Sequence, residues 1–394
     1  FGGPQGMMII ERAMDDIARE VGKDPLTIRK FNLYGGHNRT TTPYHQTVES
    51  QTLIKVIQQV EHNSQYWQRR EHITQYNKSH ERYKKGLALT PVKFGISFTV
   101  QHLNQAGALV HVYTDGSIQV NHGGTEMGQG LHTKVADIVA RVFGVDANTV
   151  QTTATRTDKV PNTSPTAASS GTDLNGQAAK NAAQTIKQRL LDYLAEHYRV
   201  DKSGIEFYCG HVFIPQSTSH NSEQFNPSEQ FNPSEHFNTA AHINSPAQTQ
   251  NLAALEDIQA PDDKGSQTQE PLVLSFAEVA QAAYMARVSL SSTGYYRTPK
   301  IHYNRSQAKG RPFFYYATGA AVSEVFIDTL TGEYKVTRVD IVHDVGESLN
   351  PAIDIGQIEG GFIQGMGWLT TEELSWSLHG QLQTQGAATY KIPT

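Results

Sequence analysis

The chain has 394 residues, of which 38% are hydrophobic, with a formal net charge of −5 at pH 7 and a mean hydropathy of −0.48. A chain of this length can bury a sizeable core and hold two or three domains, and it lacks the apolar run of about 18 residues that would predict a membrane span. Its negative charge argues against a nucleic-acid surface, because phosphate binding needs a basic face.

The first half of the chain alternates helical and strand patterns. In chain order, these patterns predict a helix over residues 7–21, a helix capped by Asp24-Pro25, strands over 94–100 and 106–112, a turn at Thr114-Asp115-Gly116, a return strand over 117–120, and helices over 131–143 and 172–197. Gly144 is expected to end the helix over 131–143, because glycine readily adopts the left-handed conformation of a C-terminal cap.

Residues 216–270 differ in composition from the rest of the chain. Within them, residues 222–238 repeat a six-residue unit as SEQFNP, SEQFNP and SEHFN, and Gln, Asn, Ser and Pro dominate. Such a stretch has too little apolar surface to offset its ordering entropy, so we interpret it as a disordered, low-complexity insertion. A metal-binding or recognition repeat is the alternative, which the small number of His residues disfavours.

Regular patterns resume after this insertion. Ser275-Phe-Ala-Glu278 is a capping box that opens a helix, strands are predicted over 320–328 and 334–343, and Asn350-Pro351 opens a last helix. Glycines at positions 356 to 365 of that helix are interpreted as points of close helix packing. Because helices and strands mix without regular βαβ spacing, the sequence predicts the α+β class.

The single cysteine, Cys209, excludes several kinds of site. The chain cannot form an internal disulfide or build a Cys-rich zinc or iron–sulfur site, and its 17 His residues contain no His-Glu-x-x-His signature. Any metal must therefore bring most of its own ligands. One thiol also fits a reducing compartment, so a cytoplasmic location is expected.

The segment Asn121-His-Gly-Gly-Thr-Glu-Met-Gly-Gln-Gly130, called the glycine turn below, is the main candidate for a ligand site. It lies between a predicted strand and a predicted helix, and its small residues let main-chain N–H groups approach a flat or anionic ligand. Its spacing matches neither the P-loop nor the Rossmann fingerprint. The alternative is a tight connection whose glycines serve geometry alone.

Four further segments accompany the glycine turn, over residues 1–6, 94–99, 160–169 and 344–357. Together the five motifs resemble those of the molybdenum hydroxylases, and most closely the molybdenum-binding part of the xanthine dehydrogenases. The resemblance spans nearly the whole chain except the insertion. It implies molybdopterin-binding domains of mixed sheets and packed helices, with residues 1–45 ending a first domain and residues 46–394 forming a second, truncated one.

The resemblance also assigns residues to a molybdenum–molybdopterin cofactor, which holds the metal through its own sulfurs. The implied cofactor-binding residues are Met127, Gly128, Gln129, Ala167, Ala168, Ser169 and Gln357. Among them, Gln129 is the amide expected to hydrogen-bond an oxo group on the metal, and Ala168 brings its backbone close to the metal. The alternative for Gln357 is an exposed helix amide.

Two aromatic rings and a hydroxyl are implied to hold a purine substrate. Phe1 and Phe98 match the rings that sandwich it, and Thr99 offers its hydroxyl. The alternatives are buried core Phe residues and a strand Thr chosen for β propensity. Neither Glu126 nor Glu359 is assigned as general base, because the family's base lies in a Gly-Glu-Pro-Pro segment expected beyond Thr394. The chain itself is therefore assigned no catalytic residue.

The implied function is that of a xanthine dehydrogenase, which acts in purine breakdown. It oxidises hypoxanthine to xanthine and xanthine to urate with water as oxygen source, and passes electrons through iron–sulfur centres and FAD to NAD+. The 2Fe-2S and FAD groups are expected on another subunit or segment, in an assembly that dimerises. The chain looks like an interior piece of a longer polypeptide, inactive alone. The alternatives are an aldehyde oxidase-like enzyme acting on aldehydes or other N-heterocycles, and a non-catalytic cofactor-binding module.

Overall fold

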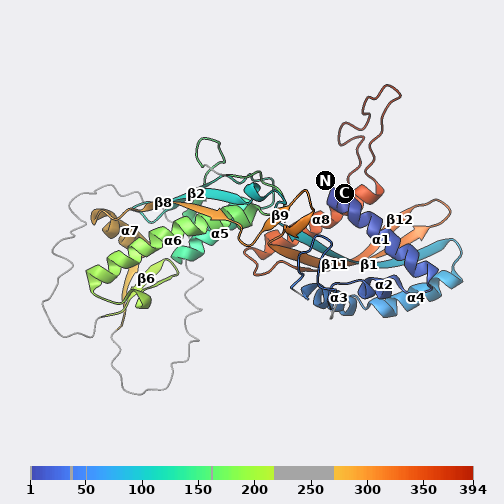
Figure 1. Cartoon of the computed structure of the whole chain (residues 1–394), viewed down its shortest axis with the longest axis horizontal. Coiled ribbons are helices and arrows are strands. Elements are labelled where there is room, and N and C mark those ends of the chain that lie inside the picture. Colours follow the sequence, from blue (N-terminus) through green and yellow to red (C-terminus); the bar gives the residue numbers. More distant parts are fainter. Residues whose placement is uncertain (1, 36–38, 50, 161–162, 217–269, 394) are drawn as a thin grey trace, which may run out of the picture.

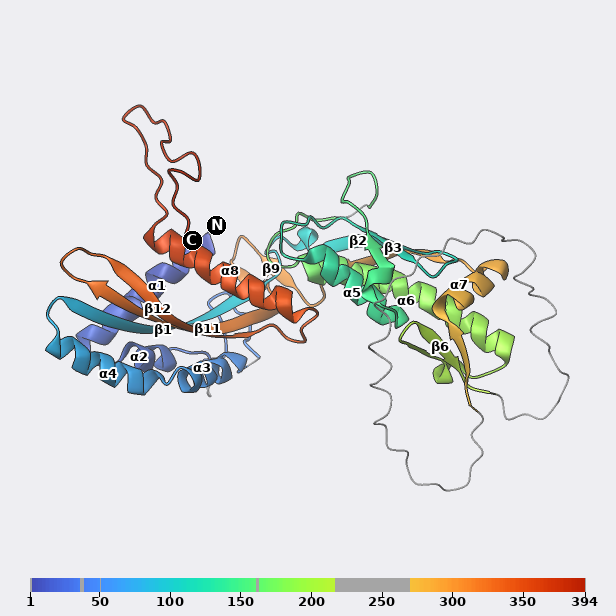
Figure 2. The same cartoon turned by 180° about the vertical axis from the view of Figure 1, so that it is seen from behind.

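The computed structural model describes residues 2–35, 39–49, 51–160, 163–216 and 270–393. Phe1 and all but the ends of the predicted insertion lie outside the described residues. Figures 1 and 2 show two lobes side by side along the long axis of the molecule. The chain begins in the first lobe, builds the second lobe, and then returns to the first.

The first lobe is built on an antiparallel sheet in the order β1-β11-β12. Its strands are β1 (Tyr83–Ile96), β11 (Tyr315–Asp328) and β12 (Tyr334–Asp344), and its helices are α1 (Gly2–Glu20), α2 (Pro25–Phe31), α3 (Thr52–Asn63), α4 (Tyr66–Ser79) and α8 (Pro351–Thr370). Helices α2, α3 and α4 lie on one side of the sheet and α8 on the other (Figures 1 and 2). Leu89 and Val322 of the sheet join Leu26, Ile57 and Val60 in the buried core of this lobe.

The second lobe carries a mixed sheet in the order β4-β3-β2-β8, in which β3 and β4 run parallel. Its elements are β2 (Gln105–Val112), β3 (Ile118–His122), α5 (Leu131–Phe143), β4 (Val150–Thr152), α6 (Gly171–Tyr198), β5 (Glu206–Tyr208), β6 (His211–Ile214), β7 (Leu272–Ser275), α7 (Phe276–Met285) and β8 (Ser291–Arg297). The remaining described elements are short 3-10 helices and strands: η1 (Gln101–Leu103), η2 (Ala147–Thr149), η3 (Lys202–Gly204), β9 (His302–Asn304) and β10 (Lys309–Arg311). The core of this lobe packs the Ala-rich face of α6 against α5 and the sheet.

Short sequence motifs explain several helix ends. Asp24 accepts a hydrogen bond from the N–H of Leu26 at 2.8 Å, and Ser275 forms a complete capping box with Glu278. Asn350 caps α8, and Gly144 ends α5 in the left-handed conformation, with φ of +64°. These helix boundaries and the predicted α+β class are confirmed.

Two predictions from the sequence are wrong in detail. The strand predicted over residues 94–100 ends at Ile96, because the buried Asn104 side chain bonds both the N–H (2.7 Å) and the C=O (2.9 Å) of Phe98 and holds a loop there. The glycines at positions 356 to 365 of α8 do not mark close packing within the described part of the chain: a Cβ on Gly356, Gly360 or Gly361 would meet no atom within 4 Å. None of the described helices is long and apolar enough to cross a membrane.

Candidate cofactor site

The glycine turn connects β3 to α5, as its flanking patterns predict. Gly128 (φ +96°) and Gly130 (φ +74°) adopt backbone conformations that residues with a side chain rarely adopt. A Cβ at Gly130 would also come within 2.6 Å of Ile353 on α8. Glycine at these two positions is therefore required by the path of the backbone and by the neighbouring helix.

Glu126 organises this turn. Its carboxylate accepts hydrogen bonds from the N–H groups of Gly128 (2.9 Å), Gly130 (3.0 Å) and His132 (3.0 Å). Partial burial disfavours the charged carboxylate, but the backbone donors outweigh that effect and lower the pKa of Glu126. A carboxylate held in this way shapes the backbone and is poorly placed to accept a proton from a substrate.

The amide of Gln129 is locked over the turn by two backbone groups. Its Oε1 accepts the N–H of Met127 at 2.6 Å, and its Nε2 donates to the carbonyl of Thr125 at 2.9 Å. Because a carboxamide nitrogen carries two hydrogens, one N–H of Gln129 remains for a ligand. The side chain of Met127 is 66% exposed next to it.

Several main-chain N–H groups of the turn are bonded within the protein and are not free for a ligand. Met127 donates to Gln129, Gly128 and Gly130 donate to Glu126, and Gly124 donates to Nδ1 of His122 at 3.1 Å. Sequence patterns did not predict these bonds, which depend on how the side chains of Glu126 and Gln129 fold back over the turn. What the turn offers a ligand is one amide N–H together with exposed backbone.

A second loop, over residues 163–170, lies against the turn. The N–H of Thr125 donates to the hydroxyl of Thr166 at 2.8 Å, which brings Ala167, Ala168 and Ser169 beside the turn. Ala168 (φ +56°) and Ser169 (φ +55°) adopt the left-handed conformation in succession. Each such residue costs about 1 kcal/mol or more, and such strain gathers at functional sites.

Helix α8 completes the site from the first lobe. The Nε2 atom of Gln357 lies 3.5 Å from the carbonyl oxygen of Gly128, at the limit of a hydrogen bond, and the Gln357 side chain is exposed. The structure thus brings together the predicted cofactor residues of three separate segments. Their individual roles toward a cofactor stay predictions.

The predicted substrate residues belong to other segments of the chain. Phe98 is half-buried and Thr99 exposed in the loop that follows β1, and neither hydrogen-bonds to the turn within the described part of the chain. Phe1 lies outside the described residues. The aromatic sandwich therefore also stays a prediction.

Polar atoms that lack a partner gather around the base of the turn. Among the described residues, the Nε2 atoms of His122 and His132, Oγ1 of Thr163 and Oδ1 of Asn175 are buried without a hydrogen-bond partner. A Cβ at Gly123 would overlap Thr163, and one at Gly124 would come within 2.7 Å of Asn175. Sequence patterns did not single out these residues, although His122 is part of the turn itself.

His122 and His132 form an edge-to-face pair with ring centroids 5.1 Å apart. Burial, helped by the nearby His132, lowers the pKa of His122 to about 4, so this ring is neutral at pH 7. Its Nδ1 accepts from Gly124, which leaves Nε2 as the N–H donor.

These donors fit a polar organic cofactor. The site offers an amide N–H, imidazole and hydroxyl groups but no thiolate, and no cluster of at least three metal-ligating side chains occurs in the described ranges. Such groups can hydrogen-bond a cofactor that brings its own metal ligands.

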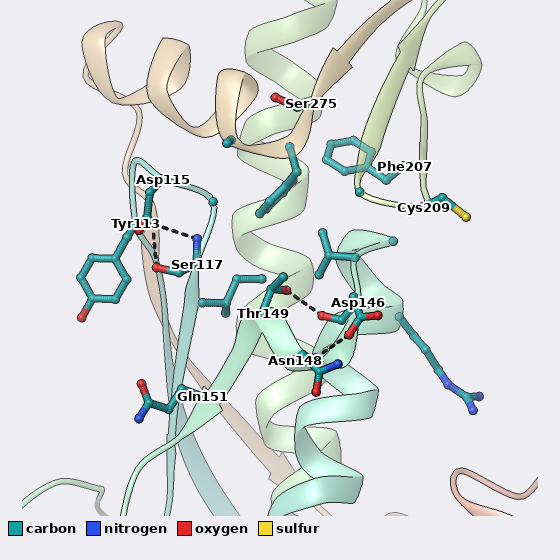
Figure 3. A pocket seen from close by; sticks show the side chains of 18 of the residues that line it. Tyr113, Asp115, Ser117, Asp146, Asn148, Thr149, Gln151, Phe207, Cys209 and Ser275 are labelled. Atoms are coloured by element: carbon teal, nitrogen blue, oxygen red, sulfur yellow. Dashed lines mark hydrogen bonds between the residues drawn. The ribbon is translucent and has the colours of Figure 1, made fainter. Parts of the chain in front are cut away.

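A cavity of about 990 Å³, drawn in Figure 3, is lined by Arg141 and Gly144 at the end of α5 away from the glycine turn. Its carboxylates close local turns: Asp115 accepts the N–H of Ser117 at 2.9 Å, and Asp146 that of Asn148 at 2.7 Å. Cys209 lies at its edge and points away from these groups. We therefore place the candidate site at the glycine turn, where strained backbone and unpartnered polar atoms coincide.

Comparison with known proteins gives a consistent family. Residues 59–254 and 238–394 match one model of the molybdopterin cofactor-binding domain, and residues 1–33 match a second model of the same description. The chain is 43% identical to xanthine dehydrogenase/oxidase of Gallus gallus over 393 residues, covering 100% of this chain and 23% of that protein. It is 39% identical to xanthine dehydrogenase of Dictyostelium discoideum, covering 100% of this chain and 24% of that protein. The chain thus spans about a quarter of the length of these relatives.

Solved structures show the same fold. Quinoline 2-oxidoreductase from Pseudomonas putida 86 superposes with a TM-score of 0.72 at 22% identity, covering 99% of this chain and 43% of that one. Aldehyde oxidoreductase from Desulfovibrio gigas superposes with a TM-score of 0.68 at 20% identity, covering 100% of this chain and 34% of that one. The predicted fold, mixed sheets with packed helices of the molybdopterin-binding type, is confirmed.

Proposed function

Because this chain belongs to the molybdopterin cofactor-binding domain family, we propose that it forms the molybdenum-cofactor portion of a xanthine dehydrogenase. The proposed reactions oxidise hypoxanthine to xanthine and xanthine to urate. Electrons are proposed to reach NAD+ through 2Fe-2S centres and FAD on another subunit or segment, in a dimeric, cytoplasmic assembly. We further propose that a first cofactor-binding domain ends near residue 45, a position between the family matches at 1–33 and 59–254.

The structural observation that best supports the proposal is the amide of Gln129, which two hydrogen bonds hold in place. When bound, the molybdenum cofactor supplies the redox chemistry that moves an oxygen atom from water to the substrate and removes two electrons from it. The contribution of the chain is to hold donors in place before reaction, which avoids reorganisation during it. Bonds to Met127 and Thr125 fix Gln129, so its remaining N–H would be held in one direction for a bound cofactor.

Other residues would position the cofactor and the substrate. The backbone of Ala168 and Ser169 would approach the cofactor beside the turn, and Gln357 would contact the cofactor from α8. Phe98 would stack on the flat substrate, with Thr99 offering a hydroxyl. The general base is proposed to lie in a Gly-Glu-Pro-Pro segment outside this chain.

The test uses the full-length protein that contains this chain. Gln129→Ala should lower purine turnover by about 100-fold, the loss typical of a donor that stabilises developing charge, and Phe98→Ala should also lower it. Gln68→Ala and Phe31→Ala, at exposed positions of α4 and α2, are the matched controls and should leave turnover unchanged. The molybdenum content of each variant separates loss of the cofactor from loss of chemistry.

Two outcomes would contradict the proposal. Unchanged purine turnover in both site variants would favour a non-catalytic cofactor-binding module. A wild-type protein that oxidises aldehydes or other N-heterocycles but no purine would favour the aldehyde oxidase-like alternative.

A further inference from the structure

A half-buried lysine in the first lobe has no carboxylate partner among the residues that the structure describes. The Nζ atom of Lys93 on β1 lies 4.0 Å from the ring centroid of Tyr316 and 5.1 Å from that of Tyr34. It forms no hydrogen bond or ion pair with any residue in the described ranges, and burial lowers the pKa of Lys93. Two aromatic faces stabilise an ammonium only in part, so the group retains unused capacity for an anion.

Lys93 belongs to a row of polar side chains across the sheet. Lys93 pairs directly with Thr318 of β11, and Thr318 pairs with Asp344 of β12, so the three share one face. This is the face that α3 covers. Thr318 is only 6% exposed, yet its hydroxyl has no hydrogen-bond partner among the described residues. A buried hydroxyl of this kind is costly unless something binds to it.

Arg311 adds a third donor. Its Nη1 bonds Glu49 at 2.9 Å and its Nη2 bonds the carbonyl of Phe314 at 3.3 Å, but its buried Nε has no partner in the described part of the chain. Lys93, Arg311 and Thr318 all line one cavity of about 260 Å³, whose walls include Tyr34, Tyr315 and Tyr316. Asp344 and Glu49 lie at the same cavity, and each already accepts a hydrogen bond from the protein.

We propose that this cavity is a binding site for a small oxyanion, either a carboxylate or inorganic phosphate, held by Lys93, Thr318 and the Nε–H of Arg311. All three groups can donate. Among the described residues, the Thr318 hydroxyl and Nε of Arg311 are buried without a partner, and Nζ of Lys93 has only its two aromatic contacts. A cavity of about 260 Å³ has room for phosphate or a small aromatic carboxylate. The tyrosine rings favour a ligand with a flat apolar part. This site lies in the first lobe, apart from the glycine turn, and does not depend on the function proposed above.

The experiment is direct titration of the full-length protein with sodium phosphate and, separately, sodium benzoate, at matched ionic strength against sodium chloride. Lys93→Met removes the ammonium and keeps the stem, and Thr318→Val removes the hydroxyl at similar volume. Lys55→Met, at an exposed position of α3, is the matched control. We expect saturable binding of at least one anion, a Kd raised at least tenfold in Lys93→Met and severalfold in Thr318→Val, and no change in Lys55→Met.

Thermal unfolding separates loss of anion binding from loss of folding in the Lys93→Met variant. Lys93→Met should unfold at the same temperature as the wild type or higher, because the variant no longer buries an unpaired charge, and it should lose the stabilisation that the bound anion gives the wild type. Absence of saturable binding in the wild type would overturn the proposal. Equal affinity or equal anion stabilisation in wild type and Lys93→Met would overturn it as well.

Discussion

The Nζ atom of Lys134 on α5 lies 2.7 Å from Oδ1 of Asp354 on α8, and this ion pair joins the two lobes beside the glycine turn. Both side chains are mostly buried, at 17% and 15% exposure. Asp354 also accepts the hydroxyl of Ser348 at 2.6 Å. The hydrogen bond from Lys134 is the main cause that lowers the pKa of Asp354. The pair therefore holds α8, and with it Gln357, against the turn.

Replacing Lys134 by Met keeps the aliphatic stem but leaves Asp354, a mostly buried carboxylate, with the Ser348 hydroxyl as its one side-chain donor among the described residues. We expect a loss of about 1–3 kcal/mol in stability, measured as a lower midpoint of thermal unfolding and faster hydrogen exchange in α8. Because the folded pKa of Asp354 is depressed, the pair contributes stability above the unfolded pKa and loses it as pH falls through the folded value. The difference between wild type and variant should therefore shrink below about pH 4.

Lys202→Met is the control for this change. Lys202 pairs with Asp192 at 3.1 Å, but both side chains are more than half exposed. Solvent screens such a pair, so the unfolding midpoint should not move. An equal shift in both variants would contradict the importance of the interlobe contact.

Glu126→Gln tests the organiser of the glycine turn. The Glu126 carboxylate accepts backbone N–H hydrogen bonds at both of its oxygens. A carboxamide has only one acceptor oxygen, so its NH₂ group would stand opposite an N–H donor. We expect faster hydrogen exchange over residues 126–132 and about tenfold less molybdenum bound by the full-length protein. Glu359→Gln, on an exposed stretch of α8, should change neither quantity. Full molybdenum content together with unchanged exchange in Glu126→Gln would refute the role given to Glu126.

Two glycine substitutions should have opposite effects. In Gly123→Ala the new Cβ would overlap Thr163, so we expect destabilisation of about 1–3 kcal/mol, as for overpacking of a core. In Gly360→Ala, in the middle of α8, the new Cβ would meet no described atom, so we expect a gain of about 0.5–1 kcal/mol from helix propensity. Chemical or thermal unfolding of both variants checks the signs. A destabilising Gly360→Ala would mean that this face of α8 is covered in the full-length protein.

His122 should make the stability of the protein depend on pH. Its folded pKa of about 4 lies below the usual 6.5, so the unfolded chain binds the proton more readily between these values. Stability should then fall as pH decreases from about 6.5 to 4, by at most about 3 kcal/mol. In His122→Asn this fall should be reduced when the unfolding midpoint is measured across that range. His72→Asn, at an exposed position of α4, should leave the wild-type profile intact.

Local signals made several parts of the fold predictable. The helix over residues 131–143 was predicted with the bounds found, because apolar side chains recur at helical spacing and Gly144 supplies the cap. The caps at Asp24, Ser275 and Asn350 are likewise properties of a few consecutive residues. By contrast, α3 and α4 were not predicted. The apolar residues of α4 follow no clear stripe, and packing on the sheet stabilises it.

By itself, the sequence determined the family, the α+β class and the glycine turn, since these depend on neighbouring residues and on motif order. Only the tertiary structure decided which distant residues contact the turn. Thr125 meets Thr166, and Gly128 meets Gln357, across 41 and 229 residues of chain. Contacts at such separations depend on how helices pack on sheets, which local patterns do not encode. The same packing buries the histidine pair and forms the Lys93 cavity. The lowered pKa of His122 and the unpartnered donors of the cavity therefore could not be predicted from local patterns.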